Sequence, residues 1–166
     1  MNEQSNRRLD GQAVAGLLSA YGKAEKIADA IDRHVMRLAL DMRADCQSLS
    51  GKICALTDKK LKYINLKVII ERALKKLPLK YGVTLKLIYC MEYGRGEAAF
   101  ATGLTARTIG NLASEGLVML SDALFDYGFD YEWYAREYKG DPYAGRCGIT
   151  ADEGLLSAAK SIENSL

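Results

Sequence analysis

The spacing of apolar residues is the feature of this sequence that most restricts its fold. Over residues 24–47 apolar residues recur every three or four positions, which is the period of one face of an α-helix. The same spacing returns over residues 65–77, 83–93 and 105–124. One of only two prolines, Pro78, follows the second of these segments and is expected to end its helix. The pattern predicts an all-α protein.

Glycines and polar clusters indicate where the helices end. We expect a short helix over residues 12–21 that stops at Gly22, and a break in the chain at residues 48–51. Residues 52–64 are expected to form a further helix that is interrupted near Thr57.

The sequence divides into three regions. Residues 1–64 form an N-terminal helical region, residues 65–125 a helical domain, and residues 126–166 an acidic aromatic tail. Within the tail, residues 150–153 have the form of a capping box, which predicts a short C-terminal helix.

The composition argues against several classes of function. His34 is the only histidine and the four cysteines form no C-x-x-C pair, so we expect free thiols, no metal site and no cofactor. The chain has no G-x-S-x-G motif and no Walker loop, which argues against an enzyme. No apolar run reaches the roughly 18 residues that a membrane helix needs, and polar residues 1–8 do not resemble a secretory signal. We therefore expect a non-catalytic, cytoplasmic protein with no membrane partner.

The charge is unevenly distributed, although the net charge is only +2. Residues 52–86 carry ten basic and two acidic side chains, whereas residues 121–166 carry four basic and nine acidic ones. A basic segment of this kind favours an anionic partner. The alternative is that its lysines only keep the helices soluble.

Residues 95–113 have the spacing of a helix-turn-helix. Such a unit needs a small residue where the two helices cross, a glycine at the tight turn, and apolar residues that hold the second helix against the first. The sequence supplies them in this order: Ala99 at the crossing, Gly103 at the turn, then Leu104, Ile109 and Leu112.

The second helix, which Thr105 can cap, is expected to have one apolar and one polar side. At about 100° per residue, one side carries Ile109, Leu112, Gly116, Leu120 and Ala123. The opposite side carries Arg107, Asn111, Ser114 and Val118. Arginine can donate twice to guanine, asparagine can pair with adenine, and hydroxyls reach phosphates or bases. The polar side is therefore what a recognition helix presents to a major groove.

The order of these motifs resembles region four of bacterial sigma factors over about residues 65–125. The matching runs are Ala73–Pro78, Leu85–Tyr89, Glu97–Ala99 and Gly103–Ile109, followed by Leu112, Leu117, Leu120 and Leu124. The resemblance implies a four-helix domain whose recognition helix binds double-stranded promoter DNA, with RNA polymerase as a second candidate partner. By position it implies DNA contacts from Thr105, Arg107, Thr108 and Asn111, with Ser114 further along. Charge and placement add Lys80, Lys86 and Arg95 as candidates for phosphate contacts.

The chain also departs from this family. Thr102 stands where leucine is usual, Phe100 stands where a polar residue is usual, and Gly110 weakens the recognition helix by roughly 1 kcal/mol relative to alanine. Residues 1–64 show no aromatic-rich helix of the kind that melts promoter DNA. A sigma-like regulator, with the layout of small phage-encoded regulators of late transcription, fits better than a complete sigma factor.

Two questions stay open at this level. The aromatic segment at residues 125–143 can pack on the helical core, dock a protein partner, or fold over the basic residues 52–86 and compete with DNA. The function can also be that of a helical protein–protein interaction module, such as a phage packaging subunit or adaptor. In that case the helix over residues 24–47 would oligomerise, and a homodimer is a candidate assembly.

Overall fold

The computed structural model describes residues 7–40 and 45–145. Within these ranges the chain forms seven α-helices, one π-helical turn and no strand, which confirms the all-α prediction. None of the helices in the described part is long and apolar enough to span a membrane.

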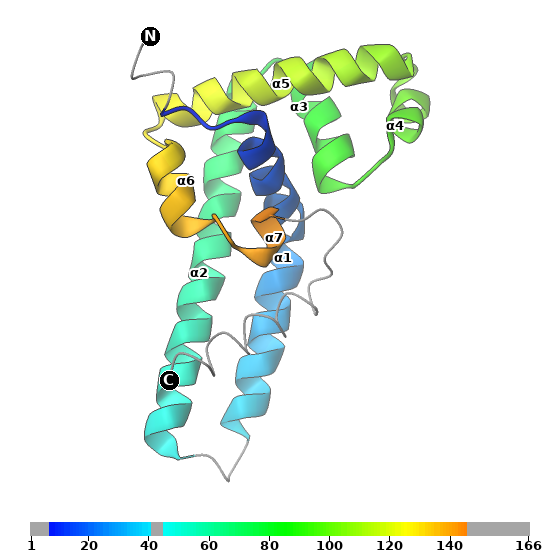
Figure 1. Cartoon of the computed structure of the whole chain (residues 1–166). Coiled ribbons are helices and arrows are strands. Elements are labelled where there is room, and N and C mark those ends of the chain that lie inside the picture. Colours follow the sequence, from blue (N-terminus) through cyan, green and yellow to red (C-terminus); the bar gives the residue numbers. More distant parts are fainter. Residues whose placement is uncertain (1–6, 41–44, 146–166) are drawn as a thin grey trace.

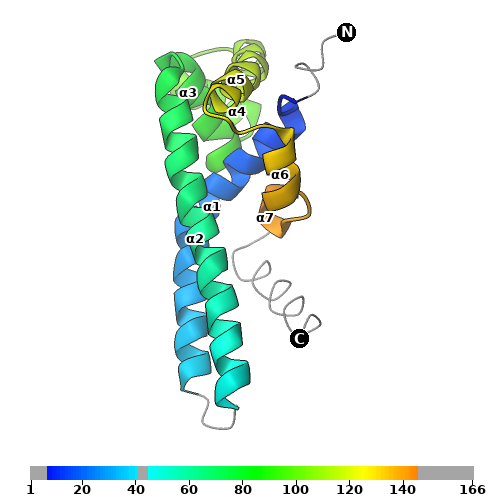
Figure 2. The same cartoon turned by 90° about the vertical axis from the view of Figure 1, so that its left-hand side faces the viewer.

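Two long antiparallel helices form the body of the molecule. Helix α1 (Gly11–Ala39) leads away from the N-terminus, and α2 (Cys46–Lys76) returns beside it (Figures 1 and 2). Their facing side chains, among them Ile27, Ile31 and Ile70, are fully buried. Because burial of each aliphatic side chain contributes about 1.5–3 kcal/mol, this interface is a major source of stability.

The limits of α1 differ from those expected. The helix passes through Gly22 without a break. The glycine allows another segment to approach, because a Cβ at this position would lie 2.7 Å from the Cα of Cys90. The helix then ends at Ala39, so the prediction of one helix over residues 24–47 is wrong at its C-terminal end.

Helix α2 also begins earlier than expected. The side chain of Asp45 accepts a hydrogen bond from the Ser48 N–H (3.2 Å) and caps the helix, so the predicted break at residues 48–51 is wrong. The helix is not interrupted at Thr57 either, because the hydroxyl of this residue donates to the carbonyl of Ile53 (2.9 Å) and stays within the helix. The predicted boundary after residue 64 falls in the middle of α2.

Three shorter elements connect the hairpin to the last long helix. Pro78 ends α2 as predicted, and α3 (Leu79–Leu85) continues into a π-helical turn at Lys86–Cys90. Helices α4 (Arg95–Thr102) and α5 (Ala106–Asp126) follow at the predicted positions. Helix α5 lies across the end of the hairpin and carries α4 at its far end (Figure 1).

The aromatic segment returns along the hairpin as α6 (Tyr131–Glu137) and α7 (Pro142–Gly145). Tyr138 and Tyr143 are buried, and the ring of Tyr143 stands perpendicular to that of Tyr63 with 5.6 Å between centroids. The interpretation that this segment packs on the helical core is therefore confirmed. The capping box predicted at residues 150–153, and the helix after it, lie outside the described residues.

Candidate nucleic-acid interface

A left-handed glycine separates α4 from α5. Gly103 has φ +70°, and the N–H of Leu104 donates to the carbonyl of Ala99 (3.2 Å), which closes the end of α4. A side chain at Gly103 would meet no atom within 4 Å, so only backbone strain disfavours other residues there. The predicted turn is confirmed, and no continuous helix runs through it.

Helix α5 begins with the cap expected from the sequence. The Thr105 hydroxyl oxygen accepts from the Thr108 N–H at 3.1 Å, and the two threonine hydroxyls lie 2.8 Å apart. At the start of α4, the Glu97 carboxylate accepts from the N–H of Gly94 (2.8 Å). Both helices of the unit are therefore closed at their N-terminal ends by their own side chains.

The inner side of α5 is buried as predicted. Ile109, Leu112 and Leu120 face the protein interior. In α4 the fully buried small residue is Ala98, whereas Ala99, expected at the closest point of the crossing, is only partly buried. Leu104 is 43% exposed, so the apolar residue after the turn contributes less to the core than the pattern indicated.

The outer side of α5 is open to solvent over its first half. Five residues predicted to contact DNA are all exposed there: Thr105, Arg107, Thr108, Asn111 and Ser114. Among the described residues, the side chains of Arg107 and Asn111 have no hydrogen-bond or ion-pair partner, whereas the Ser114 hydroxyl donates to the carbonyl of Gly110 (3.1 Å). This surface thus offers an unengaged guanidinium and amide.

Arg95 joins this surface from α4. A Cβ at Gly110 would lie 3.6 Å from the Arg95 Cζ, so the guanidinium rests against α5 at that glycine. Arg107 and Ser114 are three and four residues from Gly110 and therefore flank it on the helix surface. The glycine that weakens the helix thus lies beneath a second cationic group.

Lys80 lies on the other flank of α5. The Tyr81 hydroxyl donates to the Glu115 carboxylate (2.8 Å), and the Lys80 ammonium is 4.8 Å from the centroid of the Tyr81 ring. Gly110 and Glu115 are about 140° apart around the helix, so Arg95 and Lys80 border the outer face from opposite sides. The sequence pattern did not indicate that Tyr81 would hold Glu115 at this flank.

Lys86 lies elsewhere. It lines an open hollow of about 360 Å³ between the end of α2 and α3, together with Glu71, Lys75, Leu79 and others. The structure therefore groups seven of the eight predicted site residues along α5 and its flanks, and separates Lys86 from them.

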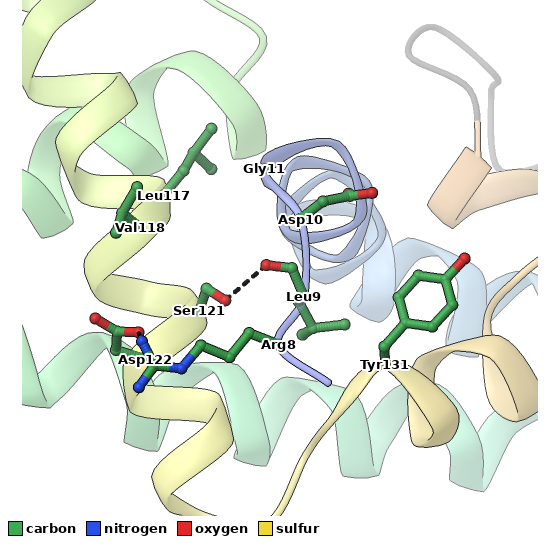
Figure 3. A pocket seen from close by; sticks show the side chains of 9 residues that line it. All are labelled: Arg8, Leu9, Asp10, Gly11, Leu117, Val118, Ser121, Asp122 and Tyr131. Carbon is green, nitrogen blue, oxygen red and sulfur yellow. Dashed lines mark hydrogen bonds and ion pairs between the residues drawn. The ribbon is translucent and has the colours of Figure 1, made fainter. Parts of the chain in front are cut away.

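The N-terminal segment lies against the second half of α5. The Ser121 hydroxyl donates to the carbonyl of Leu9 (2.7 Å), and Arg8 forms an ion pair with Asp122 (2.5 Å) (Figure 3). A hollow of about 600 Å³ opens between this segment and α5, with Val118 among its lining residues. These contacts join residues more than 110 positions apart, and the sequence carried no local signal for them.

Four of the ten basic side chains of residues 52–86 form ion pairs within the described part of the molecule. Lys60 pairs with Asp32 (2.6 Å), Lys67 pairs with Glu25, and Lys76 lies 3.8 Å from Asp126. These lysines therefore stabilise the contacts of α2 with α1 and with the end of α5.

Asp141 takes part in the most buried of these pairs. Its carboxylate accepts from the Lys62 ammonium and the Tyr63 hydroxyl, both at 2.7 Å, and from the Tyr143 N–H at 3.0 Å. Burial alone would raise the pKa of Asp141, but the Lys62 charge and these hydrogen bonds lower it below its usual value. The acidic segment thus folds over part of the basic one, as one interpretation predicted, while its competition with DNA stays a prediction.

The described residues contain no group of three or more histidine, cysteine or acidic side chains that could hold a metal ion. The thiol of Cys90 donates to the carbonyl of Leu18, and burial raises its pKa to about 12, which leaves it in the unreactive protonated form.

Comparison of the chain with protein-family models, with curated proteins and with solved structures gave no match.

Proposed function

We propose that this protein is a non-catalytic, sequence-specific DNA-binding regulator of transcription that resembles region four of sigma factors. The outer face of α5 is the observation that carries the proposal. It presents an unengaged guanidinium and amide beside three hydroxyls, directly after a left-handed turn. A generic solvated helix face more often carries lysine and glutamate than this set of base-reading groups.

In the proposed complex the first half of α5 enters the major groove. An α-helix with its side chains is about 10–12 Å across, which suits a groove about 12 Å wide. Arg107 donates to the O6 and N7 atoms of a guanine, and Asn111 pairs with the N6 and N7 atoms of an adenine. Thr105, Thr108 and Ser114 offer hydroxyls to neighbouring phosphates or base edges.

The flanking cations set the position of the helix on the duplex. Arg95 and Lys80 border the outer face on opposite sides, and each can bind a phosphate of one strand. Glu115 would repel a phosphate, but its hydrogen bond to Tyr81 holds its carboxylate at the flank. RNA polymerase is the protein partner that the sigma-like pattern favours, in a bacterial or phage setting.

The test is a binding measurement on duplexes selected from a random pool at low salt. The Arg107→Ala and Asn111→Ala variants should lose preference at one base pair each, whereas Arg95→Ala should weaken all duplexes alike and reduce the salt dependence. Arg33→Ala, an exposed arginine on α1, is the matched control and should bind like the parent. Absence of duplex binding by the folded parent protein at low salt would exclude the proposal.

One observation favours the alternative of a protein–protein interaction module. Phe100 on α4 is 93% exposed, and an aromatic side chain in that state is typical of a protein-binding surface. If Phe100→Ser leaves DNA binding unchanged and abolishes binding to RNA polymerase, both activities belong to the same unit.

A further inference from the structure

We propose that the outer face of α2 is the interface of an antiparallel homodimer. The proposal goes beyond DNA binding and concerns the side of the hairpin that points away from the protein core. Three large apolar residues lie in one line there: Leu61, Ile64 and Val68, which are 51%, 40% and 44% exposed.

The three residues have the spacing of a coiled-coil seam. Their separations of three and four residues place Leu61 and Val68 at the a positions of a heptad and Ile64 at the d position. On the helix they lie opposite the buried residues Leu66, Ile70 and Ala73, so α2 has one apolar face in the core and a narrower one in solvent. In the view of Figure 2, α2 runs in front of α1, and no described helix lies over its middle.

The charges beside the seam match in an antiparallel pair. Asp58 and Arg72 lie seven residues before and seven residues after Asn65 on the same flank, and both are exposed. Neither has an ion-pair partner among the described residues. In an antiparallel pair centred at Asn65, each Asp58 meets Arg72 of the second copy, while Leu61 meets Val68 across the seam.

On the other flank, Lys60 is already paired with Asp32 of its own chain, so the charges that select a partner are those of Asp58 and Arg72. A parallel pair would instead place Arg72 beside Lys67 of the second copy, which is a contact between like charges. These charges therefore favour the antiparallel arrangement.

The pairing determines where the two candidate DNA-binding surfaces lie. Helix α5 crosses α2 near its C-terminal end (Figure 1), so a two-fold axis at Asn65 places the two α5 helices at opposite ends of the dimer. The prediction that the helix over residues 24–47 oligomerises is replaced by this one, since Ile27 and Ile31 of α1 are buried against the hairpin's own core.

Sedimentation equilibrium of the full chain without DNA tests the assembly, so its result does not depend on the proposed function. The parent protein should be dimeric at about 100 µM, and Ile64→Glu should weaken the association by about tenfold or more. Met36→Glu changes another exposed apolar residue, on α1, and should leave the dimer unchanged. A monomeric parent, or an Ile64→Glu variant that dimerises as the parent does, would overturn the proposal.

Charge reversal tests the direction and register. Asp58→Arg should weaken the dimer by about tenfold, because attraction becomes repulsion at two symmetric contacts, and the double variant Asp58→Arg/Arg72→Asp should restore it. If the double variant is as weak as the single one, the register is wrong.

Disulfide crosslinking tests the antiparallel arrangement without a substitution that weakens the dimer. In a background with Cys46, Cys54 and Cys147 changed to serine, Asn65→Cys should form a disulfide-linked dimer on mild oxidation, because the two copies of residue 65 meet at the axis. With Asn65 intact and only Cys46 and Cys147 replaced, Cys54 should not crosslink, since its two copies lie about 33 Å apart along the helix pair. The opposite pattern would indicate a parallel pair and overturn the proposal.

Discussion

The lysines of α2 and the arginines along α5 differ in whether their charges are paired within the molecule. On α2, lysines such as Lys60 and Lys62 lie beside acidic groups from α1 and the aromatic segment, and they hold these elements together. Arg107 on α5 has no such partner among the described residues. The paired lysines of α2 thus join elements of the fold, whereas Arg107 is left accessible to a partner.

The largest expected effect on stability is at the buried ion pair between Lys62 and Asp141. Asp141→Ala should reduce the free energy of unfolding by about 3 kcal/mol, because it leaves the Tyr63 hydroxyl and the Lys62 ammonium without their common partner. Urea unfolding followed by circular dichroism measures it. A loss below about 0.5 kcal/mol would show that the aromatic segment is not held through this carboxylate.

The same carboxylate should make stability depend on pH. Since folding lowers the pKa of Asp141 below its ordinary value of 3.8, its contribution is fully present above that value and is lost as the pH falls through the lower folded pKa. Unfolding curves of the parent and of Asp141→Asn should therefore converge in acid. Parallel curves across the acid range would contradict the assignment.

On α5 the expected effect is on binding rather than on folding. Arg107→Ala should cost about 1–3 kcal/mol of affinity for a selected duplex and relax the preference at one base pair, with no change in unfolding free energy. Fluorescence anisotropy at fixed salt measures it. An equal loss on all duplexes would assign Arg107 to a phosphate instead of a base.

A substitution in the turn before α5 should have a smaller effect on stability than Asp141→Ala. Gly103→Ala should destabilise the protein by about 1 kcal/mol, because alanine is strained at φ +70° while its Cβ meets no neighbouring atom. Thermal unfolding measures it, and Gly51→Ala is the matched control, since that glycine lies inside α2 and alanine there should stabilise.

The smallest effect is expected at an exposed pair on the hairpin. Lys60→Ala should change the free energy of unfolding by less than about 1 kcal/mol, because solvent screens its ion pair with Asp32. DNA affinity should also be unchanged, which separates α2 from the α5 surface. A loss of affinity as large as that of Arg107→Ala would remove the distinction between the two regions.

The elements with strong local signals were predictable from sequence. Pro78 removes a backbone donor, Gly103 takes a left-handed conformation, and Thr105 caps the next helix. The end of α2, the end of α4 and the start of α5 therefore follow from neighbouring residues alone. The two sides of α5 followed from its period, because a helix must turn its apolar face inward.

Sequence patterns were insufficient where contacts between residues far apart in the chain determine the structure. Gly22 was predicted to end a helix, yet α1 continues through it, and the close approach of the Cys90 backbone leaves no room for a side chain there. Lys86 was grouped with the site by charge, whereas in the structure it lines the hollow between the end of α2 and α3, and its phosphate contact stays a prediction.

The amino-acid order alone determined that this chain is helical, where its sharpest turn lies, and which side chains of α5 share a face, because these depend on interactions within about four residues. The tertiary structure decided which charges are neutralised, how much of α5 is covered by the N-terminal segment, and which face of α2 stays in solvent. These features join residues far apart in the chain, and their energies exist only once the helices have packed.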